Sequence, residues 1–180
     1  MATVGGGLAH ADPAQDPPPG LIVLGAQVRL VSERGERILP VEELFRDYYE
    51  TAIEPDEIFA ELIVPSPPQD SRAVYMKYLP RTADDYPTVG VAVMVSIEDG
   101  RYTSVRVALN AVAPTPVRAN AVEDALNGEL VGDETSREAA ELIRQYLDPL
   151  DDFRGSAEYK RDMAVVFTRR ALNQVSSMAQ

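Results

Sequence analysis

The chain has 180 residues, 45% of them hydrophobic and 26% charged, which suits one large domain or two small ones and argues against wholesale disorder. Its formal net charge of -12 would repel nucleic acid and the anionic face of a membrane, so neither is an expected partner. The absence of cysteine excludes a disulfide, a thiolate metal site or an iron–sulfur cluster within the chain itself.

Targeting and membrane signals are missing from the sequence. No apolar run approaches the roughly 18 residues that a membrane helix needs, and the start, MATVGGGLAHADP, lacks the basic flank and apolar centre of a signal peptide. We therefore expect a cytoplasmic protein without membrane insertion. Any redox chemistry would have to depend on a bound cofactor.

The first 40 residues predict a short helix and a hairpin behind a glycine-rich start. The stretch TVGGGLAHADPAQD is followed by three prolines, which tolerate first-turn helical positions, so a brief helix is expected at residues 21–24. Apolar and polar residues then alternate over residues 26–31. The turn SERGE and the segment RILPV complete the pattern of two hairpin strands.

The middle of the chain predicts one helix and two strands. Residues 44–49 carry four apolar or aromatic side chains at the spacing of a short helical face. The apolar run at residues 58–64 ends at PSPP, and alternation resumes at residues 72–79. We expect two strands there and a soft boundary between them.

The strongest strand signal is PTVGVAVMVSIEDGRYTSVRVALNAVA, in which Asp99 and Gly100 suit a tight turn with positive φ angles. A helical period follows at residues 121–126, with Gly128 as a stop. Two further helical segments are expected: one from a capping box of Thr135 and Glu138 as far as Pro149, and a long amphipathic one over residues 159–175. Strands followed by helices indicate the α+β class, here with an antiparallel sheet packed with helices.

The glycine-rich start has two interpretations on residue chemistry alone. Consecutive glycines allow backbone N–H groups to converge on a phosphate, but glycines at a chain end are also typical of a fraying terminus. The spacing is not that of a Rossmann fingerprint, and the chain has no G-x-S-x-G hydrolase motif. A metal site of His10, Asp12 and Asp16 is disfavoured by Pro13 and by the lack of a second histidine.

Five segments taken together identify a resemblance that covers nearly the whole chain in collinear order. They are TVGGGLAHADPAQD, AQVRLVSERGERILPVEELF, ETAIEPDEIFAELIVPSPP, YMKYLPRTADDYPTVGVAV and SAEYKRDMAVVFTRRAL. This ordered set resembles the FAD-binding medium subunit of the molybdenum-containing hydroxylases, the family of carbon monoxide dehydrogenase, xanthine dehydrogenase and their bacterial relatives.

The resemblance implies that the family's T-[IV]-G-G loop contacts the FAD pyrophosphate through backbone amides. That role falls on Thr3, Val4, Gly5, Gly6 and Gly7. Relatives often have asparagine or aspartate at the position of Gly7, so a side-chain contact made there would be lost while the backbone contact could survive.

Four further positions are implied cofactor contacts. Asp16 would accept hydrogen bonds from ribityl or ribose hydroxyls, unless it serves as a helix N-cap. Phe59 would lie beside the isoalloxazine, unless it is an ordinary core residue.

Lys77 would lie near the ring, where its charge favours the anionic reduced flavin, or else on a solvated strand face. Tyr86 would lie by the ring and screen it from the acceptor side. Arg81, Asp84 and Asp85 are expected to form ion pairs that fix the loop, without a catalytic role.

The implied mechanism is electron relay. In this family a molybdenum-containing large subunit oxidises the substrate, a small subunit with two [2Fe-2S] clusters passes single electrons, and FAD in the medium subunit transfers them to NAD or another acceptor. The resemblance therefore implies FAD in this chain, the molybdenum cofactor and clusters in partner subunits, and an oxidoreductase activity.

Full-length relatives have another FAD-binding subdomain before the T-V-G-G loop, whereas Met1 lies two residues before Thr3 here. We therefore expect residues 1–66 to be the C-terminal part of the FAD-binding domain and residues 71–178 to be a CO-dehydrogenase-flavoprotein-like C-terminal domain. Weak FAD binding is expected for the chain alone. The alternatives are a non-catalytic module or fragment that packs against partner subunits, and an unrelated acidic α+β protein.

Overall fold

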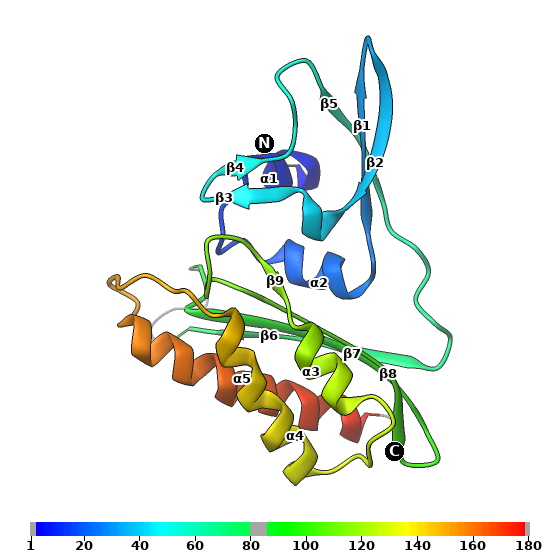
Figure 1. Cartoon of the computed structure of the whole chain (residues 1–180), viewed down its shortest axis with the longest axis vertical. Helices are drawn as coiled ribbons and strands as arrows, with labels where there is room; N and C mark the ends of the chain where they lie inside the picture. Colours follow the sequence, from blue (N-terminus) through cyan, green and yellow to red (C-terminus); the bar gives the residue numbers. More distant parts are fainter. Residues whose placement is uncertain (1–2, 80–85, 179–180) are drawn as a thin grey trace.

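Two antiparallel sheets, one in each half of the chain, form the frame of the computed structural model, which describes residues 3–79 and 86–178 (Figure 1). The helices are α1 (Val4–His10), α2 (Pro17–Val23), α3 (Asn120–Leu126), α4 (Asp133–Glu141) and α5 (Ala157–Ser177), with 3-10 turns at Val41–Glu43 and Leu142–Tyr146. The strands are β1 (Gln27–Ser32), β2 (Gly35–Pro40), β3 (Phe45–Asp47), β4 (Glu50–Thr51), β5 (Ile58–Ile63), β6 (Ser71–Tyr78), β7 (Val89–Glu98), β8 (Arg101–Asn110) and β9 (Val117–Arg118). The predicted α+β class is confirmed.

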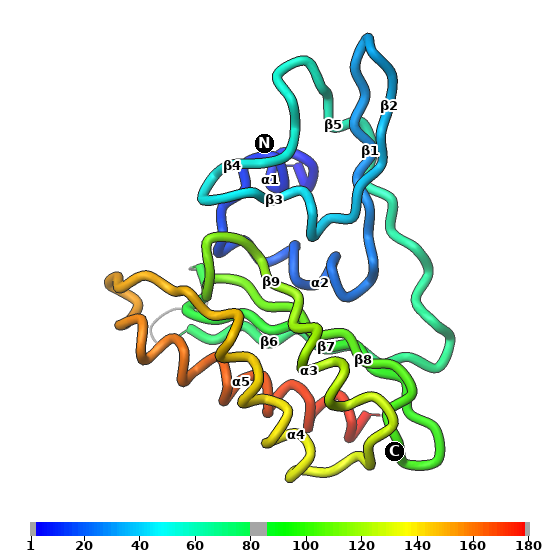
Figure 2. The backbone as a smooth tube through the Cα atoms, in the orientation of Figure 1, coloured from blue at the N-terminus to red at the C-terminus, as the bar shows by residue number. Residues whose placement is uncertain are grey.

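The upper sheet in Figure 1 has the strand order β2-β1-β5, and the lower sheet has the order β6-β7-β8-β9. The chain between β5 and β6 runs from one sheet to the edge of the other (Figure 2). The strands β3 and β4 form a separate two-stranded ribbon beside α1.

Strand β7 of the lower sheet is buried on both faces over most of its length, which explains its nearly continuous apolar run. One face carries Val89, Val91, Val93 and Val95, which pack with β8 against α3 and α5. The opposite face of the same strands contributes Ala92, Met94 and Ala108 to a second core around α2 and the upper sheet. Alternating side chains of the same strands thus join both halves of the molecule.

The hairpin turn between β7 and β8 confirms the prediction made from its sequence. Asp99 and Gly100 have φ angles of 49° and 70°, and Glu98 pairs with Arg101 across the two-residue loop. Both residue types tolerate this left-handed region at low cost, which is why the dipeptide was a reliable turn signal.

The helix α2 starts earlier than predicted, at Pro17, and includes all three prolines. A proline lacks an N–H donor, but the first-turn N–H groups of any helix have no intrahelical acceptor, so the loss has no consequence there. Ile22 and Val23 are buried and pack the helix onto the lower sheet.

The predicted helix at residues 44–49 is wrong. A 3-10 turn ends at Glu43, and the ribbon of β3 and β4 follows, with Tyr49 at a φ of 57° in its turn. The Tyr49 N–H donates to the Ala11 carbonyl, 3.2 Å away, so docking on the segment after α1 satisfies this backbone group. Such a long-range contact overrides the weak helical spacing of six residues.

The predicted capping box of Thr135 and Glu138 is also wrong. Gly132 is the N-cap of α4 and makes no side-chain capping bond, while Thr135 lies within the helix. The chain tightens to a 3-10 turn at Leu142 instead of continuing as α-helix. The long C-terminal helix is confirmed, with the Ser156 side chain accepting a hydrogen bond from the Tyr159 N–H.

No helix among residues 3–79 and 86–178 combines the length and apolar character needed to cross a membrane. Arg81, Asp84 and Asp85, which the sequence suggested as loop-fixing ion pairs, lie outside the described residues.

An ion pair between β2 and the loop before β5 leads us to expect that stability depends on pH. The Arg37 guanidinium donates to both carboxylate oxygens of Glu57 at 2.7 and 2.8 Å, and the Glu54 N–H donates to Glu57 at 2.8 Å. Arg37 first, and then the Glu54 N–H, lower the pKa of Glu57 to about 2 from its ordinary value of 4.5. A carboxyl group with a depressed pKa stabilises the fold above its unfolded pKa and loses that contribution as the pH falls.

We therefore expect the urea midpoint to fall between pH 4.5 and about 2 more steeply in the parent chain than in Glu57→Gln. Urea unfolding at half-unit pH steps measures both slopes. Parallel curves would show that Glu57 does not titrate with folding.

Candidate functional site

The glycine-rich start of the chain forms an ordered helix, which corrects its interpretation as a fraying terminus. Thr3 is the N-cap of α1, and its hydroxyl accepts a hydrogen bond from the Gly6 N–H at 3.0 Å. The side chain of Leu8 is fully buried in the core beneath the upper sheet. Because the first backbone bond of the helix runs from the Gly7 N–H to the Thr3 carbonyl, the N–H groups of Val4 and Gly5 have no intrahelical acceptor.

At two of the three glycines, the surrounding atoms leave room for a side-chain methyl group. A methyl group on Gly5 would lie 3.5 Å from the nearest atom of the Phe59 ring, and one on Gly7 would lie 3.4 Å from Gln15 Oε1. Both are tolerable contacts, and only Gly6 is crowded, by the Thr3 hydroxyl at 2.9 Å. Since glycine is less favourable than alanine in a helix by about 1 kcal/mol, packing alone does not account for this run.

The Phe59 ring lies beside Gly5 and belongs to β5, an edge strand of the upper sheet. It lies on the edge strand β5 opposite Leu30, and it is half-buried against the core around α1 and α2. The structure therefore brings Thr3, Gly5 and Phe59 together on one side of the molecule. Phe59 retains an exposed portion that a ligand can reach.

A second group of predicted residues forms between the two halves of the chain. Asp16 occupies the N-cap position of α2, as the alternative interpretation expected, but its side chain makes no capping hydrogen bond. Its Oδ2 instead accepts from Lys77 Nζ at 2.8 Å, and its Oδ1 accepts from the Tyr75 hydroxyl at 2.8 Å. The Asp16 side chain is 43% exposed and that of Lys77 is 25% exposed, so solvent reaches the pair.

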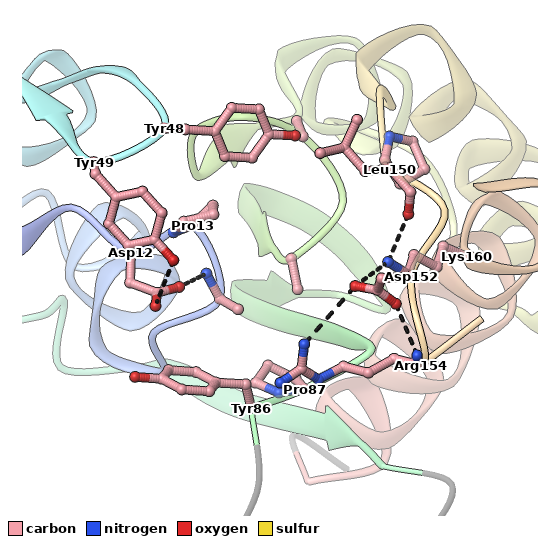
Figure 3. A pocket seen from close by; sticks show the side chains of 14 residues that line it. Asp12, Pro13, Tyr48, Tyr49, Tyr86, Pro87, Leu150, Asp152, Arg154 and Lys160 are labelled. Atoms are coloured by element: carbon pink, nitrogen blue, oxygen red, sulfur yellow. Dashed lines mark hydrogen bonds and ion pairs between the residues drawn. The ribbon is translucent and has the colours of Figure 1, made fainter. Parts of the chain in front are cut away.

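Tyr86 lies apart from the other eight predicted contacts, in a cavity of about 380 Å³ that none of them lines (Figure 3). Asp12, Tyr48 and Tyr49 form one side of this cavity, and Asp152, Arg154 and Lys160 form the other. The Arg154 guanidinium lies over the Tyr86 ring, 5.8 Å from its centroid.

On one side of the cavity, the charges of Asp152, Arg154 and Lys160 are held by one another. Lys160 is buried, and its Nζ donates to Asp152 at 2.8 Å and to the Leu150 carbonyl at 2.7 Å (Figure 3). Although burial opposes it, the hydrogen bonds from Lys160 and the Arg154 N–H hold the pKa of Asp152 below its ordinary value. Across the cavity, the Asp12 carboxylate raises the pKa of the Tyr49 phenol.

The three side chains of the disfavoured metal site point to other partners. The His10 ring packs against the Tyr49 ring with centroids 5.2 Å apart, and Asp12 Oδ1 accepts from the Ala14 N–H at 2.9 Å. Asp16 binds Tyr75 and Lys77. Within the described residues, no three histidine, cysteine or acidic side chains gather at metal-binding range.

Comparison with known proteins assigns both halves of the chain. The family described as "CO dehydrogenase flavoprotein C-terminal domain" matches residues 74–175, and the family described as "FAD binding domain in molybdopterin dehydrogenase" matches residues 1–67. The chain belongs to the FAD-binding medium subunits of molybdenum hydroxylases. The resemblance read from the sequence is thereby confirmed.

Individual members of this medium-subunit family are similar over nearly the whole chain. The carbon monoxide dehydrogenase medium chain of Afipia carboxidovorans is 33% identical over 180 residues, which are 100% of this chain and 62% of that protein. A structure of carbon monoxide dehydrogenase from Hydrogenophaga pseudoflava superimposes with a TM-score of 0.93 at 36% identity, covering 98% of this chain and 61% of that one. For quinoline 2-oxidoreductase from Pseudomonas putida 86 the TM-score is 0.88 at 30% identity, with 97% and 61% covered.

This chain thus spans about 60% of the length of the medium subunits that it matches.

Sequence reasoning missed Tyr75 and Asn110, which hold the Asp16 segment. Tyr75 and Lys77 are two positions apart on β6, and side chains two apart share one face of a strand, so this spacing was an available signal for Tyr75. Asn110 carried no such signal, because its contact with residue 15 depends on how the chain crosses between the two halves.

Proposed function

We propose that this chain is the FAD-binding part of the medium subunit of a molybdenum hydroxylase, an oxidoreductase in which electrons pass from partner iron–sulfur clusters through FAD to NAD or another acceptor. Residues 1–66 would belong to the FAD-binding domain and residues 71–178 to the C-terminal domain. The family matches support the proposal, since their descriptions name FAD and a CO dehydrogenase flavoprotein.

The observation that carries the proposal is that packing does not require glycine at positions 5 and 7, where a methyl group would fit. Gly5 and Gly7 leave open the space of a methyl group beside the helix start, where two N–H groups lack an intrahelical acceptor. A cofactor diphosphate is an acceptor that needs close backbone approach. The residues present therefore fit the diphosphate of FAD.

The remaining predicted contacts supply complementary chemistry. Asp16 would accept hydrogen bonds from ribityl or ribose hydroxyls, and the half-buried Phe59 would cover one part of the isoalloxazine. Lys77 would hold positive charge near the ring, and Tyr86 would shield the ring from the acceptor side. When bound, FAD would supply a group that can exchange electrons one at a time with one partner and two at a time with another.

A glycine substitution tests the proposal. Gly5→Ala is expected to raise the free energy of unfolding by about 0.5–1 kcal/mol, because alanine is the better helix former and its methyl fits. The same methyl would obstruct the diphosphate, so we expect FAD affinity to fall at least about tenfold, which is about 1.4 kcal/mol. Flavin fluorescence titration and urea unfolding measure the two effects.

The matched control is Gly20→Ala, another helical glycine, with no atom within 4 Å of the added methyl. It should leave FAD affinity unchanged. Equal FAD affinity of Gly5→Ala and the parent chain, or no binding by either, would contradict the proposed function.

A second candidate function, a non-catalytic module that packs against partners, is favoured by one observation. Phe153 is 68% exposed and Leu150 is 60% exposed, on the loop before α5. Exposed apolar side chains of this size mark protein contact sites when they cluster. Under either candidate, we propose the molybdenum-containing large subunit and the iron–sulfur small subunit as partners, which co-purification tests.

A further inference from the structure

The Asp16 carboxylate is held from two directions by one strand of the lower sheet. Tyr75 donates to one oxygen and Lys77 to the other, each at 2.8 Å. Both donors project from the same face of β6, which is an edge strand of that sheet. A carboxylate has about four acceptor positions, so these two bonds leave capacity for a ligand hydroxyl.

The Tyr75 hydroxyl lies close to Gly90, a position where a side chain would not fit. Lys77, Gly90 and Asn110 stand opposite one another on the adjacent strands β6, β7 and β8. A methyl group on Gly90 would lie 2.5 Å from the Tyr75 hydroxyl and 1.9 Å from Asn110 Oδ1. The glycine thus leaves the room in which Tyr75 and Asn110 lie.

The Asn110 side chain binds the backbone of the same segment. Its Nδ2 donates to the Gln15 carbonyl at 2.7 Å, and the next residue, Ala111, donates its N–H to the Pro13 carbonyl at 2.9 Å. Asn110 is fully buried at the end of β8. Two strands of the lower sheet therefore set both the backbone and the carboxylate of the Asp16 segment.

We propose that Tyr75 and Asn110 are positioning residues that orient the Asp16 carboxylate and the Lys77 ammonium for the hydroxyl groups and ring of the cofactor. The inference rests on the proposed function and deepens it, because neither residue belongs to the predicted cofactor contacts. Without the tyrosine hydroxyl, only a long lysine side chain would hold the carboxylate, which would then sample other rotamers.

The protonation state of Tyr75 is consistent with a permanent donor. Burial first, and then the hydrogen bond to Asp16, raise the pKa of its phenol above the ordinary value of 10.0. The phenol therefore stays protonated throughout the neutral range and donates to a carboxylate, which is a strong type of hydrogen bond.

The experiment is a double-mutant cycle read by FAD affinity. Tyr75→Phe should raise the FAD dissociation constant about tenfold, since hydrogen bonds to charged groups are the stronger kind. In an Asp16→Asn background the same change should have less than about a twofold effect, because Tyr75 acts through Asp16. Additive effects of the two substitutions would overturn the proposal.

The matched control is Tyr78→Phe, which removes a hydroxyl from the same strand. Tyr78 faces the helices, and its hydroxyl contacts that of Tyr159. FAD affinity of this variant should equal that of the parent. Equal losses in both variants would indicate general loosening of β6 and would also overturn the proposal.

A flavin-free measurement separates this inference from the proposed function. The 13C resonance of the Asp16 carboxyl should shift in Tyr75→Phe and stay in place in Tyr78→Phe. If the parent chain does not bind FAD, the proposed function fails, and this resonance alone decides whether Tyr75 holds Asp16. An unchanged resonance in Tyr75→Phe would refute the positioning role whatever the flavin result.

Discussion

Replacing Gly90 with alanine is expected to lower the free energy of unfolding by about 2–3 kcal/mol. The new methyl would lie 1.9 Å from Asn110 Oδ1 and 2.5 Å from the Tyr75 hydroxyl, so both side chains would have to move. Displacing the buried Asn110 also breaks its hydrogen bond to the Gln15 carbonyl. The lower entropy of the unfolded alanine chain offsets only about 0.4–1 kcal/mol of this loss.

Urea unfolding of Gly90→Ala against Gly20→Ala checks this expectation. The second variant adds the same methyl in open space, so its free energy of unfolding should match or exceed that of the parent. Similar values for the two variants would mean that the Asn110 and Tyr75 side chains move away from Gly90 without cost.

The second large effect is expected for Leu8→Ala, which should cost about 2–4 kcal/mol of unfolding free energy. Leu8 is fully buried in the core that also contains Ile22, Leu30 and Leu44. A seven-residue helix with three glycines has little stability of its own, so this side chain supplies much of what holds α1 in place.

Val4→Ala provides the comparison within the same helix, because Val4 is 55% exposed. Its cost should stay below about 0.5 kcal/mol, as for most surface substitutions. If Leu8→Ala costs no more than Val4→Ala, the glycine-rich helix is not docked in solution, and the candidate diphosphate site has no fixed shape.

The candidate site combines parts from both halves of the chain. Thr3 to Gly7 and Phe59 come from the upper half, whereas Lys77 and Tyr75 come from the lower sheet and meet Asp16 at the junction. A shared core around α2, to which β7 and β8 contribute Ala92 and Ala108, holds the two halves in register. Changes at this junction should therefore affect the site without touching a ligand.

Local sequence determined several elements of this protein. The Asp99-Gly100 turn was predictable because few residue pairs accept two positive φ angles, and the long C-terminal helix was predictable from its sustained amphipathic period. The ordered set of segments across the chain identified the family, and with it the glycines, Asp16, Phe59 and Lys77 as candidates. In each case the signal lies within the segment itself or in collinear order along the chain.

Other features were decided only by tertiary structure. Residues 45–51 pair as a ribbon because their backbone docks on the segment after α1. Asp16 binds Tyr75 and Lys77 because the lower sheet offers donors there, whereas the three prolines that begin α2 have no N–H for its carboxylate to accept. Strand register places residues that are far apart in the chain opposite one another, and the contacts of Tyr75, Gly90 and Asn110 depend on it. A short segment has too little local preference to resist such contacts, so its conformation and partners follow from the packing of the whole chain.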